Sequence, residues 1–395
     1  MTSSSLSSSP SSVPVRPTAR KGVSASNASW WAEIDTPTAH EVRSAGSQPV
    51  ADVAPDSTEL NPGRLSVAVV IPTRSRGSMI EHCLRSVMAL DRHDIQILII
   101  DQSPDDETRP SAQAVANGDS RITIIHSDSV GVSEARNLAV ELTNADVIAF
   151  ADDDCVVEPG WLDALLSEFA DPRVVGVYGR IVPPGFTTRN GTEIVFKESR
   201  SREVFEARVP PWYVGHGASR ALRRTALVGI GGFDVHLGPG ATLCAAEDLD
   251  SAYRLLVAGG RLVYTGSAVS YHKDWRDWTA RRKRERAYGV GVGAVFTKHL
   301  RCGDAYAVIL FAIWIWQLGV RRIGAGLLKW RSFKPMYLGY CELLYPWIGA
   351  VSSLRFPIDL KTRVYTANPQ HLAERGFHQS EPGHAAPSYC RTERG

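Results

Sequence analysis

The sequence of 395 residues lacks several of the features by which protein classes are recognised. Its 44 Lys and Arg are balanced by 42 Asp and Glu, so no excess of positive charge marks a general nucleic-acid-binding protein. The Ser-rich N-terminus has no apolar segment of the kind that a secretory signal needs. No Gly-x-Gly-x-x-Gly follows the first apolar run at Leu65–Pro72, which argues against a nicotinamide-dependent oxidoreductase.

Cysteine is also scarce, with six residues scattered along the chain. They form no Cys-x-x-Cys pair and no Cys/His spacing typical of a metal site. We therefore expect free thiols in a reducing compartment. The six are Cys83, Cys155, Cys244, Cys302, Cys341 and Cys390.

Apolar runs of strand length alternate with amphipathic stretches in the first half of the chain. Nearly continuous apolar runs are typical of strands buried on both faces of a parallel sheet. The stretches between them repeat apolar residues at helical spacing. Together they predict a doubly wound α/β sheet covered by helices on both faces. The predicted strands are Leu65–Pro72, Ile95–Asp101, Arg121–His126 and Asp146–Asp152; the predicted helices are Ser78–Leu90, Ser111–Asn117 and Ser133–Thr143, with Ser133 as a candidate cap.

Polar side chains follow the ends of these strands. Thr73 and Arg74 follow the first strand, Asp101 ends the second, and the three aspartates Asp152–Asp154 close the fourth. Ligands of open α/β sheets bind outside the carboxyl ends of the strands. We therefore expect the functional site at this edge of the sheet.

The three adjacent aspartates repel one another unless positive charge offsets them. The spacing of Asp152 and Asp154 suits a Mg²⁺ or Mn²⁺ ion whose remaining positions are left to phosphate oxygens. Such an ion would also neutralise charge on a diphosphate leaving group. The same pair fits a phosphatase of the haloacid-dehalogenase type, with Asp152 as nucleophile and Asp154 as acid/base. That motif belongs on the first strand of its domain, whereas here about three strand units precede it.

The order of motifs between about Ser66 and Leu300 resembles a family 2 glycosyltransferase with the GT-A fold. The resemblance rests on "VVIPTRSR", "IIDQS", "GVSEARNLAV", "IAFADDDCVVEPGWLDAL", "ALRRTALVGIGGFD", "AEDLDSAYRLLVAGG" and "YH". It implies an inverting enzyme that transfers a sugar from a nucleotide-diphosphate sugar to an acceptor hydroxyl with a divalent metal. It also implies a nucleotide-binding sheet followed by an acceptor half.

The resemblance assigns the ends of the first two strands to the donor. Pro72, Thr73 and Arg74 match the first nucleotide-contacting loop. Asp101 matches the acid that reads the base. These four residues are therefore expected to bind the nucleotide sugar.

The resemblance also assigns the start of the third predicted helix to the donor. Gly131 and Arg136 match the loop and helix that close on the nucleotide. The alternative for Arg136 is an exposed helix residue that pairs with Glu134 or Glu141.

The aspartates and a downstream histidine correspond to the ribose and metal positions of the family. Asp152 matches the ribose-side aspartate, and Asp153 is expected beside it among the donor-binding residues. Asp154 matches the metal ligand, and His272 resembles the histidine that completes the metal site in many members. A divalent Mg²⁺ or Mn²⁺ is therefore the expected cofactor.

The catalytic base of the resemblance is Asp248 in the "ED" pair. Its neighbour Glu247 is expected on the acceptor side, although acids in a first helical turn also serve as capping residues. Ser219 and Arg220 stand where the family often has asparagine and methionine. They lie on the acceptor side, so this departure puts the acceptor in question more than the donor.

The uncharged segment Ala305–Gly319 suggests contact with a membrane. Its 15 residues are fewer than the roughly 20 that span a bilayer. It is rich in Trp and lies between basic residues at Arg281–Arg286 and Arg321–Arg322, which suits an interfacial segment. The alternative is a core helix. We expect a membrane surface contact through residues 275–322 of a cytoplasmic protein peripheral to the inner face of the plasma membrane.

These observations divide the chain into a disordered leader (1–64), a catalytic domain (65–300), a helical, membrane-associated extension (301–365) and a disordered tail (366–395). The predicted acceptor is a glycan or a lipid-linked saccharide of envelope polysaccharide, glycolipid or similar glycoconjugate synthesis. The open alternatives are the phosphatase and a non-catalytic nucleotide-sugar-binding partner.

Overall fold

The structure is a computed structural model that describes residues 65–104, 107–182, 197–272, 277–329 and 331–366. The predicted leader and all but the first residue of the predicted tail lie outside these residues.

Four parallel strands form one half of a nine-stranded sheet, as the sequence predicts. Their order in the sheet is β3 (Ile122–His126), β2 (Ile95–Asp101), β1 (Val67–Thr73) and β4 (Val147–Ala151). Thr73 is paired with Asp101 across β1 and β2, so both strands end at the same edge. The aspartates that follow β4 are brought to that edge because β4 is parallel to β1.

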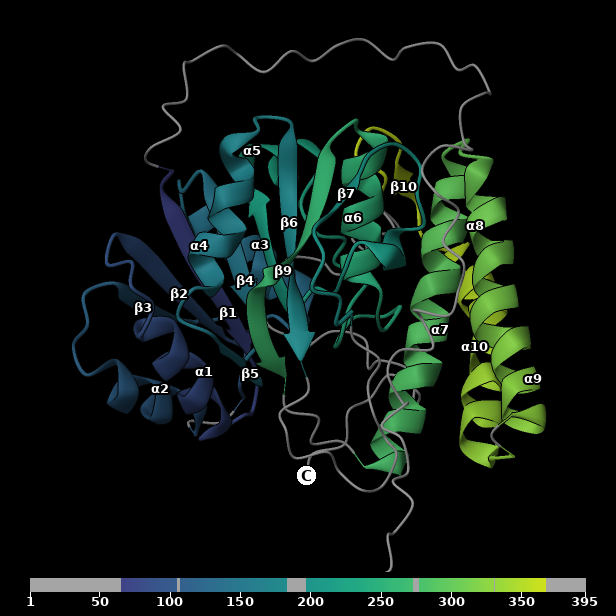
Figure 1. The fold of residues 1–395 in the computed structure, drawn as a ribbon, viewed down its shortest axis with the longest axis horizontal. Helices are drawn as coiled ribbons and strands as arrows, with labels where there is room; N and C mark the ends of the chain where they lie inside the picture. The colour runs from purple at the N-terminus through teal and green to yellow at the C-terminus, as the bar shows by residue number, and fades with distance from the viewer. Residues whose placement is uncertain (1–64, 105–106, 183–196, 273–276, 330, 367–395) are drawn as a thin grey trace, which may run out of the picture. The chain divides into compact units, whose positions relative to one another are not determined.

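Helices cover both faces of this half of the sheet, which confirms the doubly wound α/β prediction (Figure 1). Helices α1 (Met79–Met88) and α2 (Thr108–Ala116) pack on the face that also buries Trp161. Helix α3 (Val132–Leu142) packs on the other face. The prediction that Ser133 caps α3 is wrong, because the helix begins after Gly131 and the Ser133 hydroxyl donates to the carbonyl of Leu237 at 2.8 Å.

The second half of the sheet is mixed and continues from β4 in the order β8, β6, β9, β5. Strands β8 and β5 run antiparallel to their neighbours, whereas β6 and β9 are parallel to each other. The short β7 pairs with β9. The elements of this half are β5 (Cys155–Val157), α4 (Trp161–Leu166), η1 (Ser167–Ala170), β6 (Val174–Val182), β7 (Glu203–Phe205), η2 (Pro211–Tyr213), β8 (Ser219–Arg223), α5 (Arg224–Gly229), α6 (Glu247–Val257) and β9 (Arg261–His272).

The last part of the described chain is helical, with a small β-hairpin at its end. The basic stretch after Trp278 forms the start of the long helix α7, which lies beside α10 (Figure 1). The uncharged segment Ala305–Gly319 is part of a longer helix, which continues through the π-helical turn η3 into α9. The elements are α7 (Trp278–Arg301), α8 (Tyr306–Trp314), η3 (Ile315–Val320), α9 (Arg321–Leu328), α10 (Phe333–Ser353), β10 (Ile358–Asp359) and β11 (Val364–Tyr365).

Glycines allow α7 and α10 to touch backbone to backbone. A Cβ atom at Gly293 of α7 would lie 1.8 Å from the carbonyl oxygen of Pro346, and one at Gly349 of α10 would lie 1.9 Å from that of Val290. On another side of α7, a Cβ atom at Gly291 would lie 2.4 Å from the carbonyl oxygen of Ala245. Helix α7 therefore contacts both the C-terminal helix and the segment that leads into α6.

A fully buried charge cluster joins α6 to α7. The Lys298 ammonium contacts Asp234 and lies 2.8 Å from Asp250. Asp250 also accepts from Arg254 at 2.8 Å and lies 3.3 Å from His299. Burial lowers the pKa of His299 to about 4, although Asp250 opposes the shift. Since each charge has an opposite partner, the cluster is compatible with complete burial.

Replacing Lys298 should therefore destabilise the protein strongly. Lys298→Met leaves Asp234 and Asp250 short of a cation, and breaking a buried pair costs roughly 3–5 kcal/mol. Denaturant unfolding should show that loss, whereas the exposed Lys361→Met should change stability by less than about 0.5 kcal/mol. A loss for Lys298→Met no larger than that of the control would contradict this account.

The cysteines only partly follow the expectation of free thiols. Cys83, Cys155, Cys302 and Cys341 are free. Cys244 is disulfide-bonded, so the expectation is wrong at that position.

Candidate functional site

Each of the three aspartates after β4 has its own partner, an arginine for the first two and a histidine for the third. Asp152 accepts a hydrogen bond from Nη2 of Arg136 at 3.0 Å. The Nη1 of the same guanidinium donates to Glu247 at 2.8 Å. Arg136 is only 2% exposed, so the alternative of an exposed residue paired on its own helix is wrong. This side chain bridges the aspartates and the first residue of α6.

The second aspartate, Asp153, pairs with Arg76, a residue that the sequence analysis missed. The Arg76 Nε lies 3.3 Å from Asp153 Oδ1. Burial raises the pKa of Asp153 to about 7, and the positive charge of Arg76 opposes the shift. The signal for Arg76 was its place in "PTRSR", two residues after Arg74.

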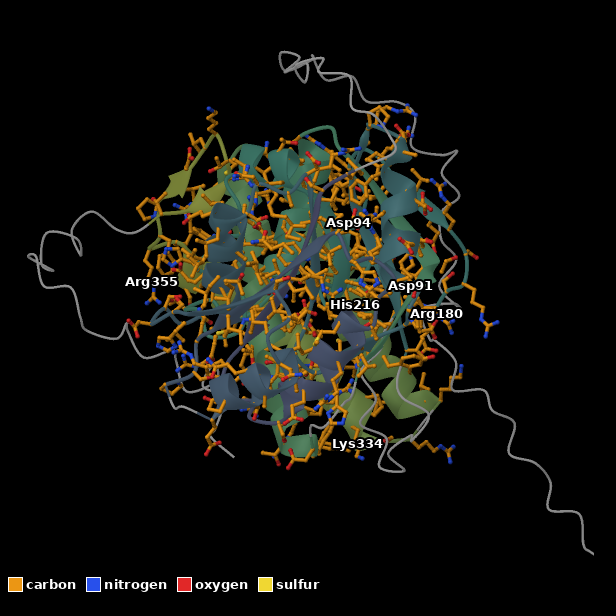
Figure 2. The ribbon with its side chains drawn as sticks, turned by 90° about the vertical axis from the view of Figure 1, so that its left-hand side faces the viewer. Asp91, Asp94, Arg180, His216, Lys334 and Arg355 are labelled. Atoms are coloured by element: carbon orange, nitrogen blue, oxygen red, sulfur yellow. The ribbon has the colours of Figure 1, made fainter. Side chains whose placement is uncertain are left out.

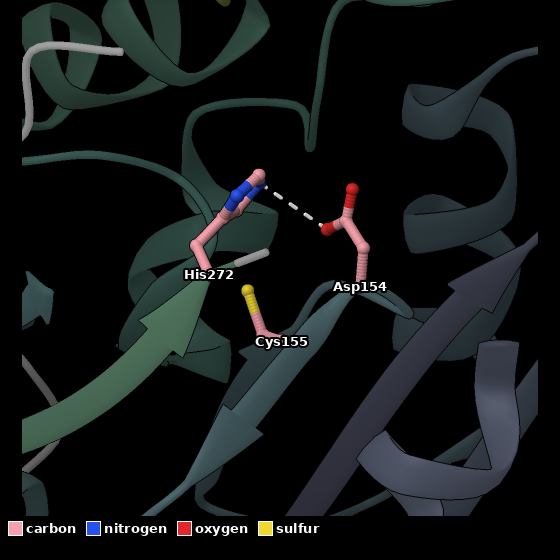
Figure 3. Close-up of side chains that lie close together, drawn as sticks. All are labelled: Asp154, Cys155 and His272. Carbon is pink, nitrogen blue, oxygen red and sulfur yellow. Dashed lines mark ion pairs between the residues drawn. The ribbon is translucent and has the colours of Figure 1, made fainter. Parts of the chain in front are cut away.

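The third aspartate, Asp154, faces His272 at the end of β9. Asp154 Oδ1 lies 3.2 Å from His272 Nε2, and Figure 3 shows the two side chains directed at each other. The pairing of β5 with β9 sets Cys155 opposite His272, and one ligand atom from each of the three residues lies within 4.8 Å of the others.

The pair of Asp154 and His272 fits a divalent ion. A carboxylate oxygen and an imidazole nitrogen held 3.2 Å apart can both reach one ion at about 2.1 Å. Both ligand types suit Mn²⁺, whereas the Cys155 thiol would favour a softer metal. Cys155 was not among the expected site residues, and only its position directly after the aspartates pointed to it.

Asp248 lies at the start of α6, directly after Glu247, the residue that Arg136 links to the aspartates. Asp248 Oδ2 accepts from the backbone N–H of Gly217 at 3.2 Å, and Oδ1 accepts from that of Leu249 at 2.8 Å. The carboxylate is half-buried and has its orientation fixed by backbone donors. It makes no ion pair with Arg136, unlike its neighbour Glu247.

His216, labelled in Figure 2, directly precedes Gly217, the residue whose backbone N–H donates to Asp248. Burial lowers the pKa of His216 to about 4; the negative charge of Asp248 opposes the shift and the positive charge of Arg284 adds to it. His216 is therefore neutral near pH 7. The sequence analysis missed it, although a histidine between two glycines in "GHG" was a signal.

The donor-side residues lie along the carboxyl edge of β1 and β2. Pro72 and Thr73 end β1, and Arg74 donates to the carbonyl of Gln102 at 2.7 Å. Asp101 accepts from the backbone N–H of Ser103 at 2.9 Å. Gly131 is linked to the same edge, because its N–H donates to the Gln102 side chain at 3.3 Å.

Ser219 and Arg220 on β8 are fully buried. The Ser219 hydroxyl accepts from the Trp161 indole at 2.8 Å, on the sheet face away from α6. The Arg220 guanidinium lies 4.8 Å from the ring centroid of Phe233 and donates to Ser251 at 3.3 Å. Burial and the charge of Arg136 lower the pKa of Arg220. Arg220 thus lies beneath α6, whereas Ser219 belongs to the opposite core.

Residues 68–230 match the family model of Glycosyl transferase family 2. The chain is 28% identical over 256 residues to the pre-mycofactocin glycosyltransferase of Mycobacterium tuberculosis, covering 63% of this chain and 51% of the relative. It is 26% identical over 238 residues to the O-antigen chain rhamnosyltransferase of Salmonella typhimurium, covering 58% of this chain and 72% of the relative. It thus spans about half the length of the first relative.

Among solved structures, the fold is similar to that of a mannosyltransferase from Pyrobaculum calidifontis in complex with GDP-Man and Mn²⁺. The TM-score is 0.51 at 21% identity, covering 78% of this chain and 91% of that one. This similarity shows a GT-A type of fold, with a helical C-terminal extension in the present chain. The family match extends from β1 to the end of α5 and so includes all three aspartates; together with the two relatives it supports a family 2 glycosyltransferase.

Proposed function

We propose that this chain is an inverting glycosyltransferase that moves a sugar from a nucleotide-diphosphate sugar to an acceptor hydroxyl. The observation that carries the proposal is the division of the site into two halves joined by Arg136. The Asp154–His272 pair lies in one half, and the backbone-anchored Asp248 lies in the other. A single displacement requires this arrangement, because the leaving diphosphate and the attacking hydroxyl are on opposite sides of the anomeric carbon.

The donor half binds the nucleotide diphosphate in this proposal. Asp101 and the end of β1 would contact the nucleoside, and Asp152 would contact the ribose. Asp154 and His272 would hold Mg²⁺ or Mn²⁺, which when bound neutralises charge on the diphosphate. The similar mannosyltransferase structure contains Mn²⁺ and GDP-Man, which supports a metal and a nucleotide sugar here.

The acceptor half supplies the base. Asp248 accepts the proton of the acceptor hydroxyl as that oxygen attacks, a contribution typically of about 10²–10⁴-fold. The N–H groups of Gly217 and Leu249 hold the carboxylate in one orientation. Glu247 is less suited to this role because Arg136 already engages its carboxylate at 2.8 Å.

The reaction belongs, in this proposal, to the synthesis of an envelope polysaccharide, a glycolipid or a similar glycoconjugate. The names of the two relatives, one acting on pre-mycofactocin and one on an O-antigen chain, support glycoconjugate acceptors in general. A panel of nucleotide sugars with purified protein, followed by nucleotide diphosphate release, tests the reaction class. Phosphate release from a simple phosphomonoester without any sugar transfer would instead favour the phosphatase alternative.

We further propose that the C-terminal helices bind the cytoplasmic face of a membrane. Within the described residues, the helix Tyr306–Leu328 is long and apolar enough to cross a membrane by length and composition. Its 23 residues have a mean hydropathy of 1.4 over the most apolar window, of which 28% is buried. Its exposed apolar residues continue onto α10, and we call this set the apolar face: Val308, Ile309, Trp316, Val320, Leu327, Leu328, Phe333, Tyr340, Leu344, Trp347, Ile348, Val351 and Leu354.

Charge supports a bilayer with anionic headgroups as the partner of the apolar face. Residues 305–355 contain six Lys and Arg against the single acid Glu342, which is buried. Each exposed cation near an anionic surface contributes about 1 kcal/mol to binding. The two arginines inside the helix, Arg321 and Arg322, favour a peripheral position over a spanning one.

Replacing two exposed tryptophans of the apolar face should weaken membrane binding. Trp316 and Trp347 are 58% and 54% exposed. Burying such a ring contributes about 1.5–3 kcal/mol, so the double change to Ser should lower affinity for phosphatidylglycerol-containing vesicles by at least about tenfold. Vesicle flotation measures this effect, with Val228→Ser on α5 as an exposed apolar control. Equal binding by the double variant and the control would contradict the proposal.

A further inference from the structure

Helix α7 lies between the segment that leads into α6 and helix α10, which carries part of the apolar face. Gly291 touches the backbone of Ala245, two residues before Glu247. Residues three and seven positions earlier on a helix project to the same side. Tyr288 and Arg284 therefore face the same side as the start of α6.

Tyr288 connects this side of α7 to the aromatic residues of α8. Burial, and after it the negative charges of Asp248 and Glu247, raise the pKa of Tyr288. Its ring is stacked on Trp314, with centroids 6.1 Å apart and planes 24° apart. Trp212 packs edge-on against the same Trp314 at 5.2 Å.

Trp314 is the buried member of this aromatic group. It is 3% exposed, and its indole N–H donates to Glu342 of α10 at 2.9 Å. Tyr288 and Trp212, in contrast, are half-buried and retain surface for a ligand. Aromatic rings held in this way offer flat apolar surfaces for the C–H faces of a sugar.

Arg284 supplies a loosely paired cation one helical turn before Tyr288. Its side chain is 31% exposed, and its Nη2 lies 3.9 Å from Glu285. Glu285 is already engaged by Arg322 at 2.7 Å, so the charge of Arg284 remains available for another anion. The positive charge of Arg284 also lowers the pKa of His216, after the larger effect of burial. His216 directly precedes Gly217, which anchors Asp248.

The order along this side is thus carboxylate base, aromatic rings and guanidinium, and α7 packs against α8 and α10, which carry part of the apolar face. A saccharide carried on a lipid phosphate has the matching order of hydroxyl, sugar ring, phosphate and hydrocarbon. We infer that the acceptor is a lipid-phosphate-linked saccharide whose sugar contacts Tyr288 and Trp212 and whose phosphate pairs with Arg284. This inference rests on the proposed function and specifies its acceptor.

Vesicle binding by the full chain tests the phosphate contact. The probes are phosphatidylcholine vesicles that contain either a polyprenyl phosphate or phosphatidylglycerol at equal charge. We expect tighter binding to the polyprenyl phosphate vesicles, and Arg284→Gln should reduce that affinity roughly tenfold because a guanidinium–phosphate pair is lost. Arg282→Gln is the matched control, since that guanidinium lies over Tyr337 of α10, 5.9 Å from the ring centroid.

Three outcomes would overturn the inference. These are equal binding to the two kinds of vesicle, an equal loss in the Arg284 and Arg282 variants, and removal of the preference by dilute inorganic phosphate, which would indicate a site for free phosphate. Calorimetric titration of the wild-type chain with Mn²⁺ and a panel of nucleotide sugars reports the donor half separately. Binding of none of these donors beside an intact vesicle preference would contradict the proposed function alone.

Discussion

Asp154→Ala is expected to reduce sugar transfer by on the order of a thousandfold or more while the protein stays folded. The change removes one of the two ligands held 3.2 Å apart, and a divalent ion contributes several kcal/mol to the stabilisation of developing charge. His272 alone would bind the ion weakly. Mn²⁺ affinity, measured by calorimetry on the same samples, should fall together with turnover.

The matched control for Asp154 is Asp163→Ala, because Asp163 is an exposed aspartate of α4. It should leave both Mn²⁺ affinity and turnover close to wild type. Full activity of the wild-type protein in excess EDTA would contradict the metal role of Asp154 and His272, whatever the variants show.

Asp248→Asn is expected to lower turnover by at least about a hundredfold, because the amide cannot accept the proton of the acceptor hydroxyl. Donor binding should change little, since the Asp248 carboxylate is anchored by the backbone N–H groups of Gly217 and Leu249 and Arg136 pairs with Glu247 instead. Steady-state kinetics with saturating donor, together with calorimetric titration of the donor, separates the two effects.

Glu247→Gln is the informative neighbour of that variant. Glu247 pairs with Arg136, which also holds Asp152, so its loss should weaken donor binding and affect turnover less. If Asp248→Asn kept near-normal turnover, or lost donor affinity to the same extent as Glu247→Gln, Asp248 would not be the base.

The parallel half of the fold was predictable because its signals are local. Each buried strand is a continuous apolar run, and its polar end residues follow directly, as with Thr73, Asp101 and Asp152. Strand pairing then brings these ends together without further information. The positions of α1 and α3 followed for the same reason.

The partners of the site residues were not predictable, because they are separated by long stretches of chain. Arg136 and Glu247 are 111 residues apart, and nothing in the spacing of either predicts their ion pair. Gly217 and Asp248 are linked through a backbone N–H, which has no signal in the side-chain pattern. The continuation of the apolar helix had no apolar signal, because Arg321 and Arg322 follow the uncharged segment, whereas the helix continues past them and Arg322 pairs with Glu285.

The contacts of α7 have a mechanical consequence. At Gly293 and Gly349 the backbones of α7 and α10 meet directly, and at Gly291 α7 meets the backbone of Ala245. No flexible side chain lies between these backbones at the three positions, so a displacement of α10 cannot be absorbed by rotamer changes there. A displacement of the C-terminal helices is therefore passed through α7 to Ala245, three residues before Asp248.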